Sequence, residues 1–118
     1  MSISDFFSND LQTSDNHKNP DLVTHYYKSD YRKIEETVLS VAKKLGFEVK
    51  EVNEDYKEIR IEKRSQEIII NIFTISYFEQ AVDLKVNTSY ILACGRGVKL
   101  VKTFYQELDR LATVLKKG

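Results

Sequence analysis

The segment AVDLKVNTSYIL, residues 81–92, alternates apolar and polar side chains. In a strand, Val82 and Leu84 would face one side, while Asp83 and Lys85 would face the other. One dry face and one wet face are typical of antiparallel sheets, because the dry face packs on a core and the wet face meets water. The segment therefore predicts an antiparallel sheet that needs an apolar layer on one side.

Three more strands are predicted before this one. They are Phe47–Val52, Glu58–Lys63 and Glu67–Ser76. The last of them has apolar residues on both faces, which indicates a central strand or one whose outer face is also covered. The short polar connections between these strands favour a meander of hairpins.

A helix is predicted before the strands, starting after Ser29 or Asp30 as its N-cap. Its apolar stripe repeats at steps of three and four and consists of Tyr31, Ile34, Val38, Val41 and Leu45. Gly46 then ends the helix in a left-handed conformation, and Phe47 folds back onto Ala42 in a Schellman motif.

A second helix is predicted to close the chain, from about Val98 to Lys116. Its wide apolar stripe includes Val101, Phe104, Leu108, Leu111 and Leu115, as expected for a helix that lies across a sheet. With an opening strand at Leu22–Lys28, the element order is β-α-β-β-β-β-α. We expect an α+β two-layer sandwich with both helices on one face of an antiparallel sheet.

The domain organisation is one α+β domain over residues 22–118, preceded by a tail over residues 1–21. The tail is rich in Ser, Asp and Asn. Its apolar residues are Ile3, Phe6, Phe7 and Leu11, which could line a short docking helix. A loose tail is the alternative.

Composition limits the classes of function. The chain has 18 basic and 18 acidic residues, so it lacks the basic surplus that nucleic-acid binding usually requires. One cysteine allows no internal disulfide. No apolar run is long enough to span a membrane, and the first residues do not form a signal peptide. We expect a cytoplasmic monomer or weak homodimer with no membrane partner.

A candidate binding loop, Cys94, Gly95, Arg96 and Gly97, precedes the closing helix. Backbone amides at a helix N-terminus can bind an anion, and Arg96 could add a charged contact. The alternative is a turn that needs glycine for its backbone angles. Cys94 has no base beside it in the sequence, which favours a buried thiol. No spacing predicts a metal site, a cofactor or a catalytic residue, and we expect no enzyme.

The closing helix carries a resemblance to a known family. Gly95, Val101, Phe104 and Leu108 resemble the C-terminal signature of the bacterial domain-of-unknown-function family 1499. The layout of residues 22–111 is similar as well, although Gly97 stands where that family often has Asn and Leu100 where it often has Arg. The resemblance implies the fold and no established activity.

The element order is also similar to the TATA-binding-protein-like and helix-grip folds, but a shared fold does not transfer function. We expect a non-catalytic binding or protein-interaction module whose partner is a protein or a small molecule. It would use the groove between the closing helix and the sheet, or the open sheet face, lined by Asp83, Lys85, Asn87 and Ser89. The alternatives are a carrier of a small apolar ligand in that groove, a self-associating protein, and a small enzyme that uses Cys94 or the Gly95-Arg96-Gly97 loop.

Overall fold

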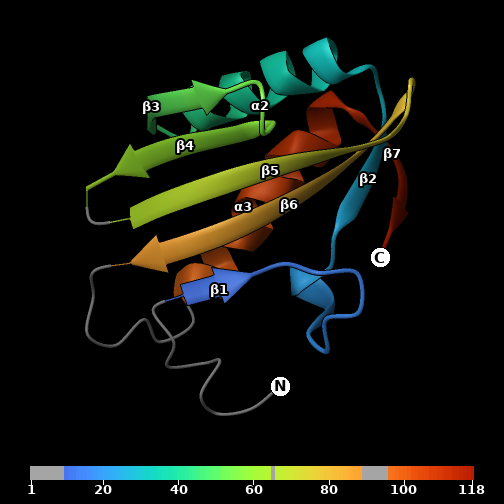
Figure 1. Cartoon of the computed structure of the whole chain (residues 1–118). Helices are drawn as coiled ribbons and strands as arrows, with labels where there is room; N and C mark the ends of the chain where they lie inside the picture. The colour runs from blue at the N-terminus through green and yellow to red at the C-terminus, as the bar shows by residue number, and fades with distance from the viewer. Residues whose placement is uncertain (1–9, 65, 89–95) are drawn as a thin grey trace.

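The computed structural model describes residues 10–64, 66–88 and 96–118. The strands are β1 (Asp10–Gln12), β2 (His25–Lys28), β3 (Glu48–Asn53), β4 (Glu58–Lys63), β5 (Gln66–Ser76), β6 (Glu79–Thr88) and β7 (Thr113–Lys117). The helices are η1 (Pro20–Leu22, a 3-10 turn), α2 (Tyr31–Lys44) and α3 (Arg96–Leu111). The strands form one antiparallel sheet, and α2 and α3 lie behind it in Figure 1. The predicted α+β two-layer sandwich is confirmed.

The sheet runs in the order β3-β4-β5-β6-β2-β7, and β1 also pairs with β6. Its inner face supplies one layer of the core, where Ile61, Ile70 and Leu84 have no exposed surface. Val38 of α2 and Phe104 of α3 are equally buried in the facing layer. Each such side chain contributes about 1.5–3 kcal/mol through the burial of apolar surface. The predicted central position of β5 is confirmed, because it lies between β4 and β6.

Helix α2 begins and ends as the sequence predicts. Asp30 is the N-cap, and its side chain accepts a hydrogen bond of 2.8 Å from the Lys33 backbone N–H. At the other end, the Phe47 N–H donates to the Ala42 carbonyl at 2.9 Å. Gly46, with φ of +84°, lies in the left-handed region. This is the Schellman geometry, and it turns the chain directly into β3.

The prediction for the end of the chain was wrong. Helix α3 stops at Leu111, and residues 113–117 form β7, which pairs antiparallel with β2. Val114 packs against the core, whereas Leu115 is 47% exposed. β-branched Thr113 and Val114 favour a strand, and the free edge of β2 supplies the hydrogen-bonding partner.

One long edge of β6 is shared by two strands. β1 pairs with Lys85–Asn87, and β2 pairs with Glu79–Val82. Thr13 closes the seam between them: its N–H donates to the Leu84 carbonyl at 3.0 Å, and its hydroxyl accepts from the Leu84 N–H at 2.9 Å. Residues of the predicted tail therefore belong to the sheet, with Leu11 buried in a strand. Ile3, Phe6 and Phe7 lie outside the described residues.

Within the described ranges, no helix combines the length and the apolar character needed to cross a membrane.

Candidate functional site

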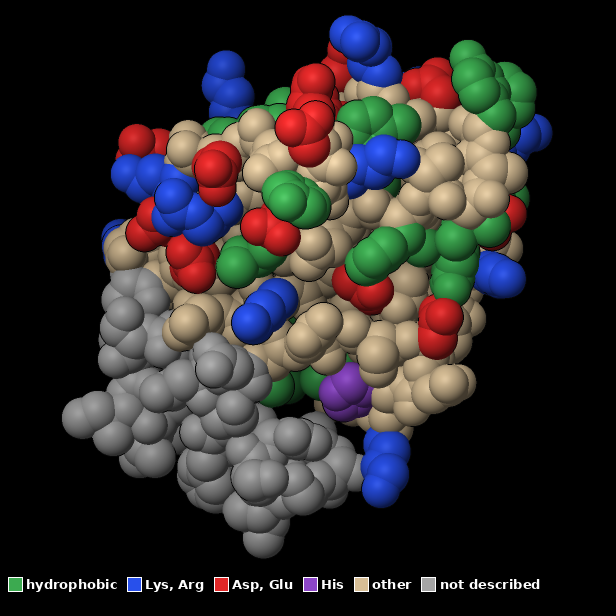
Figure 2. Space-filling model, in the orientation of Figure 1, with side chains coloured by type: hydrophobic (Ala, Val, Ile, Leu, Met, Phe, Trp, Pro, Cys, Tyr) green, Lys and Arg blue, Asp and Glu red, His purple; other side chains and the backbone are tan. Residues whose placement is uncertain are grey.

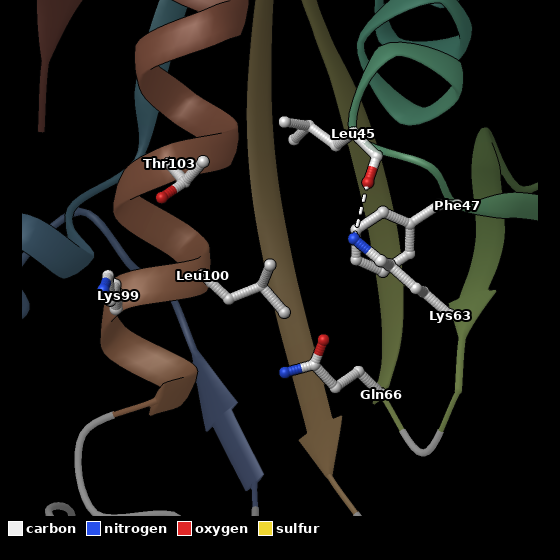
Figure 3. Close-up of a pocket in the computed structure, with 7 residues that line it drawn as sticks. All are labelled: Leu45, Phe47, Lys63, Gln66, Lys99, Leu100 and Thr103. Atoms are coloured by element: carbon white, nitrogen blue, oxygen red, sulfur yellow. Dashed lines mark hydrogen bonds between the residues drawn. The ribbon is translucent and has the colours of Figure 1, made fainter.

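A groove of about 250 Å³ lies between α3 and the β4–β5 end of the sheet. We call it the helix–sheet groove, and its lining residues are Leu45, Phe47, Lys63, Gln66, Lys99, Leu100 and Thr103 (Figure 3). They come from three places in the chain: the end of α2, the β4–β5 hairpin and the first turns of α3. None of the seven is acidic.

Residues at the α2–β3 junction and the end of β4 form one wall. The Schellman turn directs Phe47 inward, where it is buried. Lys63 crosses this ring, with its ammonium 5.7 Å from the ring centroid, and donates a hydrogen bond of 2.9 Å to the Leu45 carbonyl. An ammonium has three N–H donors, and this is the one hydrogen bond that the Lys63 ammonium makes with the described residues. The positive charge of Lys63 is thus held at the groove, and two of its N–H donors remain for a ligand.

Helix α3 forms the opposite wall. Leu100 projects from the helix toward Gln66 and Lys63 in Figure 3. Lys99 is exposed to water, whereas Leu100 and Thr103 are half-buried. The groove therefore has apolar surface at its centre and two lysines at its margin. Such a site fits a small molecule with an apolar body and a negatively charged group, because each part meets its complement.

The predicted binding loop is only partly described. Cys94 and Gly95 lie outside the described residues, and the Arg96 backbone begins α3. Gly97 allows close packing: a Cβ atom there would lie 2.5 Å from Leu11 Cδ1. The glycine thus brings α3 against β1.

The expected open face is partly covered. Lys85 and Asn87 are exposed, but Asp83 accepts hydrogen bonds from Thr13 and Thr24 at 2.7 and 2.5 Å. Ser89 lies outside the described residues. The wet face of β6 is therefore open mainly at its Asn87 end.

A polar cluster that the sequence does not predict lies where β2 meets α3. His25 Nδ1 lies 3.0 Å from Asp109 Oδ1, and the Tyr27 hydroxyl donates to that oxygen at 2.6 Å. The His25 ring stacks on Tyr105 with centroids 3.6 Å apart. Burial acts to raise the pKa of Asp109, but hydrogen bonds from His25 and Tyr27 outweigh it and hold this pKa below its ordinary value. Asp109 is thus a carboxylate at neutral pH.

No three metal-binding side chains (His, Cys, Asp or Glu) gather into a possible ion site in the part of the chain that the structure describes.

Comparisons with known proteins do not assign this chain to a family. Neither a scan against protein-family models nor a search of curated proteins found a match to this chain. The resemblance to family 1499 therefore stays a prediction.

Proposed function

We propose that this chain is a non-catalytic binding module whose ligand occupies the helix–sheet groove. The observation that carries the proposal is the combination of an apolar centre, Phe47 and Leu100, with lysines at the margin and no acidic residue among the lining. The proposed ligand is a small amphipathic acid with a short apolar chain and a carboxylate. A volume of about 250 Å³ is slightly below the usual range for drug-sized ligands.

The inward-facing residues of the β4–β5 hairpin support this proposal. Inward-facing positions of β4 run Ile59, Ile61 and Lys63, so the buried row ends in a lysine. On β5 the inward row begins with Gln66 before Ile68. Polar groups thus replace apolar ones at the end of the core, next to the groove.

The test is binding of octanoate to the full chain, followed by amide chemical shifts and calorimetry. We expect saturable binding with shift changes at Leu45, Phe47 and Leu100. Octanol, which lacks the charge, should bind roughly tenfold more weakly, the loss expected from one charge-assisted contact of about 1.4 kcal/mol. Octylamine should bind more weakly still.

Two variants and one control locate the site. Lys63→Gln should weaken octanoate binding toward the octanol value, and Leu100→Ser should weaken both compounds. Leu115→Ser removes an exposed leucine from β7 and should change neither. If none of the three compounds causes a saturable shift at the groove residues, the proposal is wrong.

A second candidate function, protein interaction, is supported by the end of the β5–β6 hairpin. Four large apolar side chains there are 52 to 74% exposed, and we call them the hairpin patch: Phe73, Ile75, Tyr77 and Phe78. Figure 2 has hydrophobic surface over this hairpin, at the right of the view, with charged side chains among it. Apolar clusters exposed in this way mark sites of association.

We take the partner of the hairpin patch to be a second copy of the chain. Both signs of charge flank the patch, since Lys57 donates to Thr74 and Glu79 begins β6. A patch with its own counter-charges can face itself across a twofold axis. Sedimentation velocity should detect a dimer at high concentration, and Phe73→Ser with Tyr77→Ser should remove it. Tyr56→Ser, in the neighbouring β3–β4 turn, is the matched control. A monomer at every concentration would exclude self-association through the hairpin patch.

A further inference from the structure

A second cavity, of about 160 Å³, opens beside the His25–Asp109 pair. Its lining residues come from η1, β2, α3 and β7: Pro20, Asp21, His25, Lys102, Tyr105, Gln106, Asp109 and Lys117. It shares no residue with the helix–sheet groove. At roughly 30 Å³ per water molecule, it has room for a group of about five non-hydrogen atoms.

With His25 neutral, the charged side chains that face this cavity are balanced. Lys102 and Lys117 are positive, and Asp21 and Asp109 are negative. Asp109 is already occupied, because His25 and Tyr27 contact one carboxylate oxygen and Lys117 Nζ lies 3.7 Å from the other. Protonation of His25 would add one positive charge and leave a net positive cavity.

The ring of His25 is held in one orientation. It is 5% exposed, stacked on Tyr105 and bonded through Nδ1 to the Asp109 carboxylate. An acceptor at Nδ1 places the proton on that nitrogen, so Nε2 is the nitrogen left for a ligand. No described residue forms a hydrogen bond with Nε2. The protonated ring donates from Nε2, whereas the neutral ring accepts there.

We propose that this cavity is a proton-linked site for a small oxyanion, a carboxylate or a phosphate-type group. Protonated His25 donates from Nε2 to one oxygen of the anion, and Lys102 and Lys117 supply the remaining charge. Tyr27 is a positioning residue, because it does not line the cavity and acts on the anion through Asp109 and the His25 ring. Asp109 lines the cavity itself and orients the His25 ring through Nδ1. Where the free ring is neutral, anion binding takes up a proton, so affinity falls as pH rises.

The experiment follows the side-chain nitrogens of both histidines by ¹⁵N NMR in the full chain. Sulfate stands for the tetrahedral anion and acetate for the carboxylate, since both keep their charge between roughly pH 5.5 and 8, where histidines titrate. Chloride holds the ionic strength constant. We expect a saturable shift of His25 Nε2 and no shift of His17, the other histidine of the chain. Affinity should fall as pH rises, by up to about tenfold per pH unit where the free ring of His25 is neutral.

Each outcome decides the proposal. Saturation by sulfate alone or by acetate alone supports it and identifies the anion class. No saturable shift at His25, equal shifts at both histidines, or an affinity that does not change with pH would overturn it.

Lysine variants test the location without disturbing the buried cluster. Lys102 is exposed, so Lys102→Gln should leave the fold intact and weaken sulfate binding by about three- to tenfold, the loss of one charged contact. Lys99→Gln is the control, because Lys99 lies on the same helix but lines the helix–sheet groove. An equal loss in both variants would mean nonspecific attraction to α3 and would contradict the site.

Discussion

Gly46 shows how one residue sets up the candidate groove. Its φ of +84° turns the chain from α2 into β3, so that Phe47 becomes buried. A Cβ there would meet nothing closer than 3.6 Å, at the end of the Lys63 side chain. The glycine is therefore required for its backbone angles and not for space.

Gly46→Ala should destabilise the fold by about 1 kcal/mol, the cost of the left-handed conformation for a residue with a Cβ. Gly46→Asn should cost less, because asparagine tolerates this conformation. Urea denaturation of the two variants checks the prediction. Equal losses would mean that crowding against Lys63 causes the effect.

At Gly97, by contrast, glycine is required because a larger side chain would not fit. A Cβ atom would lie 2.5 Å from Leu11 Cδ1 and 3.3 Å from its Cγ. Gly97→Ala should cost about 1–3 kcal/mol through overpacking. In a Leu11→Ala background the same change should become neutral or slightly stabilising, because alanine favours helix more than glycine by up to about 1 kcal/mol. A double-mutant cycle in urea measures this coupling, and simple additivity would contradict the packing explanation.

The hydrogen bond between Tyr26 and Asp15 makes a contribution to stability that depends on pH. Its hydroxyl donates to Asp15 at 2.6 and 2.7 Å, and this hydrogen bond, with burial and charge repulsion, raises its pKa to about 12. The ordinary tyrosine pKa is about 10. Because the folded-state pKa is the higher one, the contact stabilises the fold fully below about pH 10 and is lost as pH rises through about 12.

Asp15→Asn should return the pKa of Tyr26 toward the ordinary value, as ring ¹³C titration of the assigned residue would detect. Its destabilising effect should shrink between roughly pH 9 and 12. A Tyr26 titration that is the same in both proteins would show that Asp15 is not the cause.

At the scale of elements, residues 113–117 can be tested for a strand, β7, against the helix that the sequence predicts. A helix to Lys116 would bury Leu115, whereas the strand exposes Leu115 and packs Val114 on the core. Leu115→Asp should therefore change stability by no more than about 0.5 kcal/mol. Val114→Asp should cost about 1–3 kcal/mol, because it places a charge at a half-buried position opposite Tyr27. Thermal unfolding of both variants checks the order, and the reverse order would restore the helix.

The elements that the sequence predicts well are those with local signals. Asp30 and Gly46 mark both ends of α2 by their own chemistry, and period-two alternation identifies β4 and β6. β7 could not be found in this way, because Ala112 and Leu115 continue the helical period of α3. Its partner, β2, lies far away in the sequence, and only the tertiary fold brings their edges together.

The candidate sites are harder to predict for the same reason. Lys63 and Gln66 do carry a signal, since they interrupt inward rows of isoleucine. His25 with Tyr27, and Tyr105 with Asp109, each share one face of an element. That these faces meet depends on the position of α3 across the sheet, which no local pattern contains.

In the whole molecule, α3 separates the two hollows. Lys99, Leu100 and Thr103 line the helix–sheet groove, whereas Lys102, Gln106 and Asp109 line the cavity at His25. The helix thus contributes to one core and two potential binding sites. A rotation of α3 would change both at once.

The seam at Thr13 has a consequence for how the molecule opens. The Leu84 amide is held by the Thr13 hydroxyl instead of a backbone carbonyl, so its hydrogen is released whenever residues 10–24 lift from β6. Deuterium exchange at the Leu84 amide should be faster than at the amides of Asp83 and Lys85, which point toward β5, and should quicken further in Thr13→Val. Thr13→Ser, which keeps the hydroxyl, should retain the slower rate. The exchange rate of the Leu84 amide thus reports how often the N-terminal segment detaches from β6 while strands β3 to β6 stay paired.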